Sequence, residues 1–117
     1  MGYSQSTYHA FGVHVPREQY QTGHTRSEGE RLDEVICRHP ELNALGVGYL
    51  SAGDYDRDEL FMVVRKPGEQ LEVEVGSFMV LSGVDVTGRA EAVKALAEAA
   101  GYSGLAEPGW LVVPDVS

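Results

Sequence analysis

Hydrophobic and polar residues alternate with a period of two in several short stretches of this chain, and that pattern predicts β-strands. The first stretch, Tyr8–Val15, is rich in aromatic and β-branched residues and ends at a proline, which cannot continue a β-ladder. The stretches Leu45–Ala52 and Leu60–Arg65 flank a polar turn and therefore predict a hairpin. Two further strands are predicted, a short one at Leu71–Val75 and a last one at Trp110–Val113.

Two other stretches have apolar residues at a helical spacing. In the first stretch the positions i, i+3, i+4 and i+7 hold Leu32, Val35, Ile36 and His39. Ser27 and Glu30 form a capping box at the start of this helix, and Pro40 predicts its end. In the second helix the corresponding stripe is Val93, Leu96, Ala97 and Ala100. Thr87 is its expected N-cap, and Gly101 supplies the left-handed residue that ends many helices.

The predicted order of elements is β-α-β-β-α-β, with an extra β segment between the third strand and the second helix. Two helices that cover one face of an antiparallel sheet in this order are typical of the ferredoxin-like split β-α-β fold. The chain of 117 residues has the commonest size of one domain, and no linker divides it. We expect a single α+β domain over residues 1–117, in which the path of residues 76–86 is not predicted.

The third predicted strand is apolar on both faces. Leu60, Met62 and Val64 lie on one side, and Phe61 and Val63 lie on the other. The last strand shows the same property, although a sheet with helices on one side should be polar on the other. Either the extra β segment or a second copy of the chain must then cover the second face. We expect the second copy, and therefore a homodimer.

Three glycines, Gly12, Gly46 and Gly48, could lie near one another on that second face if their strands are neighbours. Their absent side chains would leave a shallow trough. The residues of this candidate ligand or interaction site, with its borders, are Tyr8, Gly12, His14, Gly46, Gly48, Leu50 and Trp110. The alternative is close packing of a helix or an aromatic ring against the glycines, which is the commoner use of such positions.

The charge balance changes which partners are expected. The chain has 18 acidic and 9 basic side chains and a formal net charge of −9. Neutralising phosphates is the dominant favourable term in nucleic-acid binding, and an acidic chain gains nothing from it. The charge favours a basic protein partner or simple solubility, and it disfavours direct binding of DNA or RNA.

The predicted hairpin turn contains a partial calcium-loop pattern. Asp54, Asp56 and Asp58 recur at alternate positions, as the carboxylates of such a loop do. The pattern then fails, because Glu59 stands where the loop needs Gly and Arg65 stands where it needs a bidentate Glu. The three aspartates are weak metal candidates, and a solvated acidic hairpin tip is the favoured interpretation. We predict no metal site and no cofactor.

No catalytic constellation is found in the sequence. Cys37 follows two apolar residues near the end of its helix, where the helix dipole does not favour a thiolate, so we expect a small core or boundary residue. No third glycine follows Gly46 and Gly48 in a dinucleotide-binding pattern. His14 with Tyr8 or Tyr49 is the acid–base cluster that the sheet could form. We expect no catalytic residues and favour a protein that is not an enzyme.

The sequence also bears on location. No apolar run is long enough to span a bilayer, and the first six residues lack the basic and apolar regions of a secretory signal. The single cysteine excludes an internal disulfide framework. We expect a cytoplasmic protein with no membrane contact.

Three stretches of the chain are familiar together: residues 8–13 (YHAFGV), 54–61 (DYDRDELF) and 107–115 (EPGWLVVPD). With them, most of the chain resembles small proteins of actinobacteriophages and related actinobacteria, a family of unknown function. The resemblance implies no site residue. It implies a context, because accessory phage proteins of this size often act by binding host proteins in the host cytoplasm.

Three functional hypotheses follow. The first is a non-enzymatic interaction module, a homodimer whose acidic surface binds a basic site on a host or phage protein, for example a defence or regulatory factor. The second is a small-molecule or nucleotide-binding protein, or a minor enzyme, that uses the glycine trough with His14. The third is a component of the virion or of its assembly.

Overall fold

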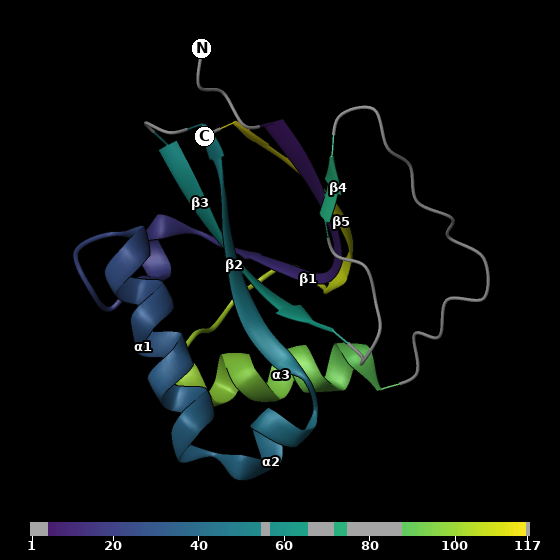
Figure 1. Ribbon diagram of the computed structural model, residues 1–117. Helices are drawn as coiled ribbons and strands as arrows, with labels where there is room; N and C mark the ends of the chain where they lie inside the picture. The colour runs from purple at the N-terminus through teal and green to yellow at the C-terminus, as the bar shows by residue number, and fades with distance from the viewer. Residues whose placement is uncertain (1–4, 55–56, 66–71, 75–87, 117) are drawn as a thin grey trace.

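The computed structural model describes residues 5–54, 57–65, 72–74 and 88–116 (Figure 1). The prediction of Thr87 as a helix cap lies outside these ranges, and so do residues 76–86, for which no path is predicted. The described residues form an α+β fold, which confirms the predicted class.

Five strands lie close to the predicted positions. They are β1 (Gln5–Val15), β2 (Val47–Asp54), β3 (Arg57–Val64), β4 (Glu72–Glu74) and β5 (Gly109–Val116). β2 and β3 form the predicted antiparallel hairpin, in which Val47 lies opposite Val64 and Asp54 lies opposite Arg57. Both strands extend into the stretch predicted as a turn, since β2 ends at Asp54 and β3 begins at Arg57.

The helices are α1 (Thr25–Arg38), α2 (Pro40–Ala44) and α3 (Arg89–Ala100), and a 3-10 turn, η1 (Arg17–Gln19), follows β1. The predicted capping box is wrong. α1 begins earlier, with His24 as its N-cap, and the ring of His24 accepts a hydrogen bond from the backbone N–H of Ser27. Ser27 and Glu30 therefore lie inside the helix.

The predicted ends of both helices are correct. Pro40 ends α1, and it also occupies the first turn of α2, where a missing backbone N–H has no cost. Gly101 ends α3 in the left-handed conformation, with φ of 86°.

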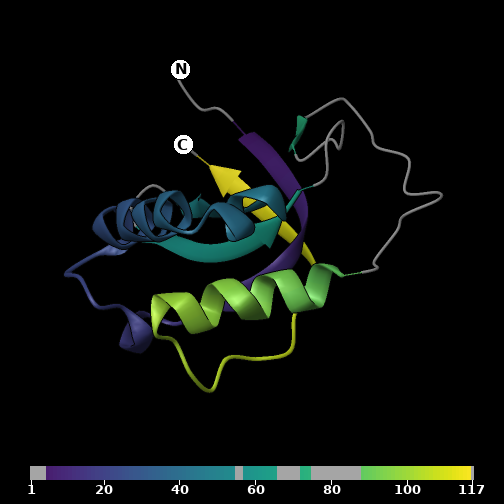
Figure 2. The ribbon, with the colours of Figure 1, turned by 90° about the horizontal axis from the view of Figure 1, so that it is seen from below.

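β1 has different neighbours along its length. Residues 5–12 pair antiparallel with β5, and residues 11–15 pair antiparallel with β3. The short β4 pairs with residues 6–8 of β1. Figure 2 shows β1 curving from the N-terminus down to the level of α3, so its two halves belong to two different walls of the sheet.

The sheet closes on itself. Its order is β3-β2-β5-β1-β4 with a further pairing of β3 to β1, and β2 meets β5 at Asp54 and Val116. The finer prediction, a ferredoxin-like arrangement, is not confirmed, because β2 also pairs with β5 and β4 is added to β1, whereas an open sheet of that kind has no contact between its edge strands. The difference arises at the bend of β1, which no local sequence pattern encodes.

Two clusters of buried apolar side chains lie on the two faces of the sheet. The larger cluster lies under α1 and α3 and includes Val13, Val15, Leu32, Leu60, Met62 and Leu96. The smaller cluster lies inside the curl of the sheet and consists of Ala10, Ala52, Phe61, Val63 and Val113.

The smaller cluster accounts for the strand that is apolar on both faces. Phe61 and Val63 are only 8% and 4% exposed, and they share this cluster with Ala10 of β1 and Val113 of β5. The sequence analysis expected the extra β segment or a second copy to cover this face. In the structure the curl of the sheet itself brings apolar side chains of other strands onto it.

Candidate functional site

The three glycines of the predicted trough do not line a common hollow. A Cβ on Gly12 would lie 2.0 Å from the carbonyl oxygen of Met62, so backbone occupies that space. Gly46 has φ of 80°, and a Cβ there would lie 2.5 Å from the carbonyl oxygen of Arg65. Gly48 alone of the three faces open space. Gly12 and Gly48 do share one row, because both pair with Val63.

The residues at the predicted borders of the trough are dispersed. Tyr8 packs against the smaller cluster of buried apolar side chains. His14 is exposed, and its Nε2 atom lies 2.9 Å from Oε2 of Glu59. Leu50, like Tyr8, packs against the smaller cluster. Tyr49 lies against Gly29 of α1, on the helix-covered face, so the predicted cluster of His14 with Tyr49 does not form.

The acidic hairpin tip is described only in part, because Asp56 falls outside the described ranges. The backbone carbonyl of Asp58 accepts hydrogen bonds from Arg17 at 2.7 Å and from the Thr25 hydroxyl at 3.1 Å. Asp54 ends β2 opposite Arg57. Over the described residues, no group of three or more His, Cys, Asp or Glu side chains is arranged to hold a metal ion.

Cys37 is exposed on α1, so its predicted place in the core or at its boundary is wrong. The apolar stripe of α1 buries Leu32 and Ile36, and the residue after Ile36 falls 100° away from that stripe. The thiol therefore points to solvent.

Trp110 pairs with Phe11 of β1, so its side chain lies on the Phe11 face of the sheet and not on the Gly12 face predicted for the trough. Its ring stacks on His9 with centroids 4.8 Å apart and planes 9° apart, and it meets the edge of Phe11 at 5.4 Å. The guanidinium of the buried Arg89 lies 5.2 Å from the ring centroid. Trp110 still leaves 38% of its surface exposed, and Val112 on the same side of β5 leaves 67%. We call Trp110, Val112 and His9 the aromatic face.

A buried carboxylate, which the sequence analysis missed, joins three segments of the chain. Glu28 of α1 is fully buried. Its Oε1 atom accepts hydrogen bonds from the backbone N–H groups of Gln21 and Thr22, both at 2.9 Å, and from the Thr22 hydroxyl at 2.8 Å. Its Oε2 atom accepts from the Arg31 guanidinium, at 2.8 and 3.1 Å, and from the Tyr102 hydroxyl.

These contacts set the ionisation of the cluster. Burial would raise the pKa of Glu28, but hydrogen bonds from Arg31, Tyr102 and Thr22 outweigh it and lower the pKa from 4.5 to about 2. Burial and the hydrogen bond to Glu28 raise the pKa of Tyr102. One signal could have revealed Glu28, since it stands four residues before Leu32 and therefore on the buried stripe of α1. Because every lone pair has a donor, the cluster has a structural role.

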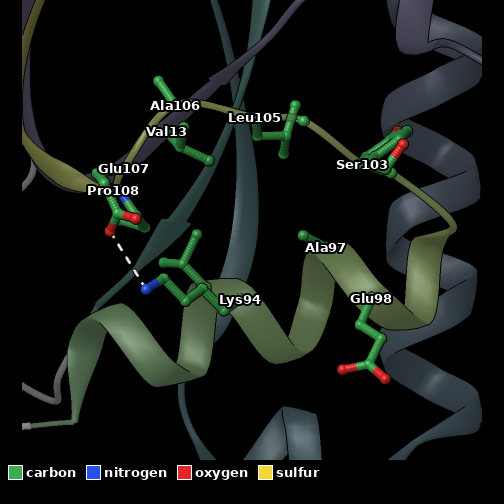
Figure 3. A pocket seen from close by; sticks show the side chains of 12 residues that line it. Val13, Lys94, Ala97, Glu98, Ser103, Leu105, Ala106, Glu107 and Pro108 are labelled. Atoms are coloured by element: carbon green, nitrogen blue, oxygen red, sulfur yellow. Dashed lines mark ion pairs between the residues drawn. The ribbon is translucent and has the colours of Figure 1, made fainter.

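A pocket of about 230 Å³ lies between α3 and the segment of residues 102–108 (Figure 3). Its apolar walls come from Val13 of β1, Val93 and Ala97 of α3, and Leu105 and Pro108 of the crossing segment. The segment is anchored at one end by Gln19, whose side chain donates to the carbonyl of Ser103 at 2.7 Å and accepts from its N–H at 3.2 Å.

Charged side chains stand at the rim of this pocket. Lys94 of α3 reaches Glu107 of the segment, with 3.2 Å between Nζ and Oε2, and this ion pair closes one end of the pocket (Figure 3). Glu98 stands one helical turn beyond Lys94 and is exposed. Both partners of the ion pair are mostly exposed, so the pair contributes little to stability.

Four carboxylates of α1 and α2 are exposed. We call them the acidic helix face; they are Glu30, Asp33, Glu34 and Glu41. Arg26 and Arg38 pair with two of these carboxylates, each one helical turn away. The ion pairs of the described residues include neither Asp33 nor Glu41. This face is therefore negative.

Comparison of the chain with protein-family models, curated proteins and solved structures finds no match. None of the helices in the described ranges combines the length and the apolar content that crossing a bilayer requires.

Proposed function

We propose that this protein is a non-enzymatic interaction module that binds a basic site on another protein through its acidic helix face. The observation that carries the proposal is that Asp33 and Glu41 are exposed carboxylates without an ion pair among the described residues, on a chain of net charge −9. Complementary charge accelerates encounter and selects partners of opposite sign. The resemblance to actinobacteriophage proteins favours a host or phage protein as the partner and the host cytoplasm as the place.

The test is capture of partners from an actinobacterial lysate, followed by binding measurements with the purified partner. We expect the double variant Asp33→Asn, Glu41→Gln to weaken binding roughly tenfold. The matched control is Glu91→Gln, Glu98→Gln, which removes the same charge from the exposed side of α3 and should leave affinity unchanged. Affinity that is insensitive to salt, or equal loss in both double variants, would contradict the proposal.

We also propose that the protein is a homodimer, and we assign the contact to the aromatic face. The support is that Trp110 and Val112 are large apolar side chains exposed side by side on β5. Aromatic residues are enriched at the centres of protein interfaces. Phe61 and Val63 do not support a dimer, because both side chains are buried within the protomer.

A second candidate function is small-molecule binding. The glycine trough does not favour it, since backbone atoms fill two of its three positions. The specific observation in its favour is the pocket beside α3, which has apolar walls and a charged rim. Thermal-shift screening against nucleotides and metabolites tests this candidate, because a ligand that binds the folded state raises the melting temperature.

We propose that the split β-α-β-β-α-β plan underlies the curled sheet. Its support is that β5, β1, β3 and β2 are successive neighbours and all pair antiparallel, which is the neighbour order of that plan. A solved structure in which α1 and α3 do not share one face of the sheet would contradict it.

A further inference from the structure

We propose that the pocket between α3 and the segment of residues 102–108 binds a small primary amine that has an apolar body. The inference rests on the second candidate function, small-molecule binding, and is independent of the proposed protein interaction. Three observations carry it: the size of the pocket, the chemistry of its walls, and the charges at its rim.

The size of the pocket sets the size of the ligand. A cavity of about 150 Å³ lined by apolar side chains is enough for benzene. The pocket beside α3 holds about 230 Å³, which is below the about 300–1,000 Å³ typical of sites for drug-sized ligands. It therefore fits one ring or a short branched chain with a substituent.

The buried part of the lining favours an apolar body for this ligand. Val93 of α3 is 1% exposed and Val13 of β1 is 4% exposed. Val13 and Leu105 lie on the side of the pocket opposite Ala97 of α3 (Figure 3). Tyr102 also lines the pocket, but its hydroxyl donates to Glu28. The polar handles left for a ligand are therefore the charged side chains of the rim and the backbone of the crossing segment.

The negative charge of the chain favours a cation. At the rim Lys94 pairs with Glu107, whereas the carboxylate of Glu98 points away from the crossing segment (Figure 3). The whole chain adds a negative field, which concentrates small cations at its surface. The side chain of Lys94 resembles such a ligand, because it is an aliphatic chain that ends in an ammonium group. Its Nζ atom lies 3.2 Å from Oε2 of Glu107, the position that we expect a ligand ammonium to take. A ligand ammonium can replace Lys94 at Glu107 at little cost, since this ion pair is exposed.

The experiment uses three probes of equal size and different charge: benzylamine, benzyl alcohol and benzoate. Binding to the full chain is followed at pH 7 by methyl NMR shifts of Ala97 and Leu105 and by calorimetry. We expect benzylamine to bind most tightly, with a dissociation constant of about 1 mM, benzyl alcohol more weakly and benzoate most weakly.

Charge variants at the rim give effects of opposite sign. Lys94→Gln frees Glu107 and should tighten benzylamine binding about threefold to fivefold, whereas Glu107→Gln should weaken it by a similar factor. Neither variant should change the affinity for benzyl alcohol. If benzoate binds more tightly than benzylamine, or if Glu107→Gln leaves benzylamine binding unchanged, the amine assignment is overturned.

A filling variant separates this inference from the second candidate function. Ala97→Leu should abolish binding of all three probes, and Ala99→Leu, which adds the same group to an exposed position of α3, should abolish none. Melting curves establish that both variants are folded. If the three probes fail while the metabolite screen yields another ligand that Ala97→Leu blocks, the amine class is wrong and small-molecule binding stands. If no probe or screened ligand is blocked by Ala97→Leu, both are wrong.

Discussion

At the scale of single residues, Gly12 determines how closely two strands approach. It lies opposite Val63 of β3 and opposite Gly109 of β5, at the bend of β1. A Cβ at this position would lie 2.0 Å from the Met62 carbonyl oxygen and 2.9 Å from the Val63 Cα, and backbone atoms cannot move aside as a flexible side chain can. We predict that Gly12→Ala lowers the free energy of unfolding by at least about 3 kcal/mol, measured by urea denaturation.

Gly48→Ala is the matched control. Gly48 pairs with the same residue, Val63, but its missing Cβ faces open space. Alanine in a strand should therefore leave stability unchanged or raise it by up to about 1 kcal/mol. Equal losses in the two variants would show that the close approach at Gly12 is not what requires glycine.

Gly12 and Gly48 were both predicted to line a trough, and this prediction is wrong for Gly12, whose missing side chain leaves no open space. An absent side chain is visible in the sequence, whereas the backbone that fills its place comes from Met62, fifty positions away. Trp110 was predicted as a residue of the trough, but it pairs with Phe11 and its side chain lies on the face of the sheet opposite to that of Gly12. Its contacts with His9 and Arg89 depend on pairings that only the folded sheet brings about.

At the scale of elements, Glu28 links the start of α1 to the loop before it and to the end of α3. Its oxygens accept from the Thr22 backbone, from Arg31 and from Tyr102. We predict that Glu28→Gln lowers the free energy of unfolding by about 3 kcal/mol, because the neutral amide leaves the partly buried Arg31 without its charge partner. Chemical denaturation at pH 7 measures the loss.

The control for this prediction is Glu30→Gln on the same helix. Glu30 is exposed and pairs with Arg26 at 3.5 Å, so its loss should change stability by no more than about 0.5 kcal/mol. A Glu28 variant as stable as the Glu30 variant would mean that the cluster contributes no net stability.

The elements themselves are well predicted by local patterns. The apolar stripe with Leu32 and Ile36 located α1 correctly, and Pro40 and Gly101 marked the ends of α1 and α3. These signals are reliable because helical periodicity and helix-ending residues act over a few positions. The start of α1 was misplaced, since Ser27 and Glu30 satisfy the capping-box pattern while His24 provides the cap. The local sequence offers more than one possible N-cap for α1. We infer that the contacts of Glu28 with the preceding loop and with Tyr102 favour the start at His24.

At the scale of the whole molecule, the Glu28 cluster makes stability depend on pH. The pKa of Glu28 is lowered in the folded state, from 4.5 to about 2. Its contribution is therefore complete above pH 4.5 and is lost as the pH falls toward 2. We predict that the stability gap between wild type and Glu28→Gln is about 3 kcal/mol at pH 6 and narrows to about 1 kcal/mol at pH 3. Urea denaturation of both proteins across this range measures it.

The other carboxylates titrate in both wild type and Glu28→Gln, so their effects on stability cancel in the difference between the two proteins. A gap that stays constant from pH 6 to pH 3 would mean that the Glu28 pKa is not lowered. A gap that widens on acidification would mean that its sign is reversed.

The curl of the sheet also determines which apolar residues remain for association. Val63 and Val112 are the same residue type, but Val63 is 4% exposed inside the curl and Val112 is 67% exposed on the aromatic face. We predict that Val63→Asp unfolds the protein, because it buries an unpaired charge. Val112→Asp should keep the melting temperature and convert the proposed dimer into a monomer in analytical ultracentrifugation. Wild type that sediments as a monomer would reject the dimer, and a Val112→Asp variant that remains dimeric would assign the contact to another surface, such as the exposed Leu45.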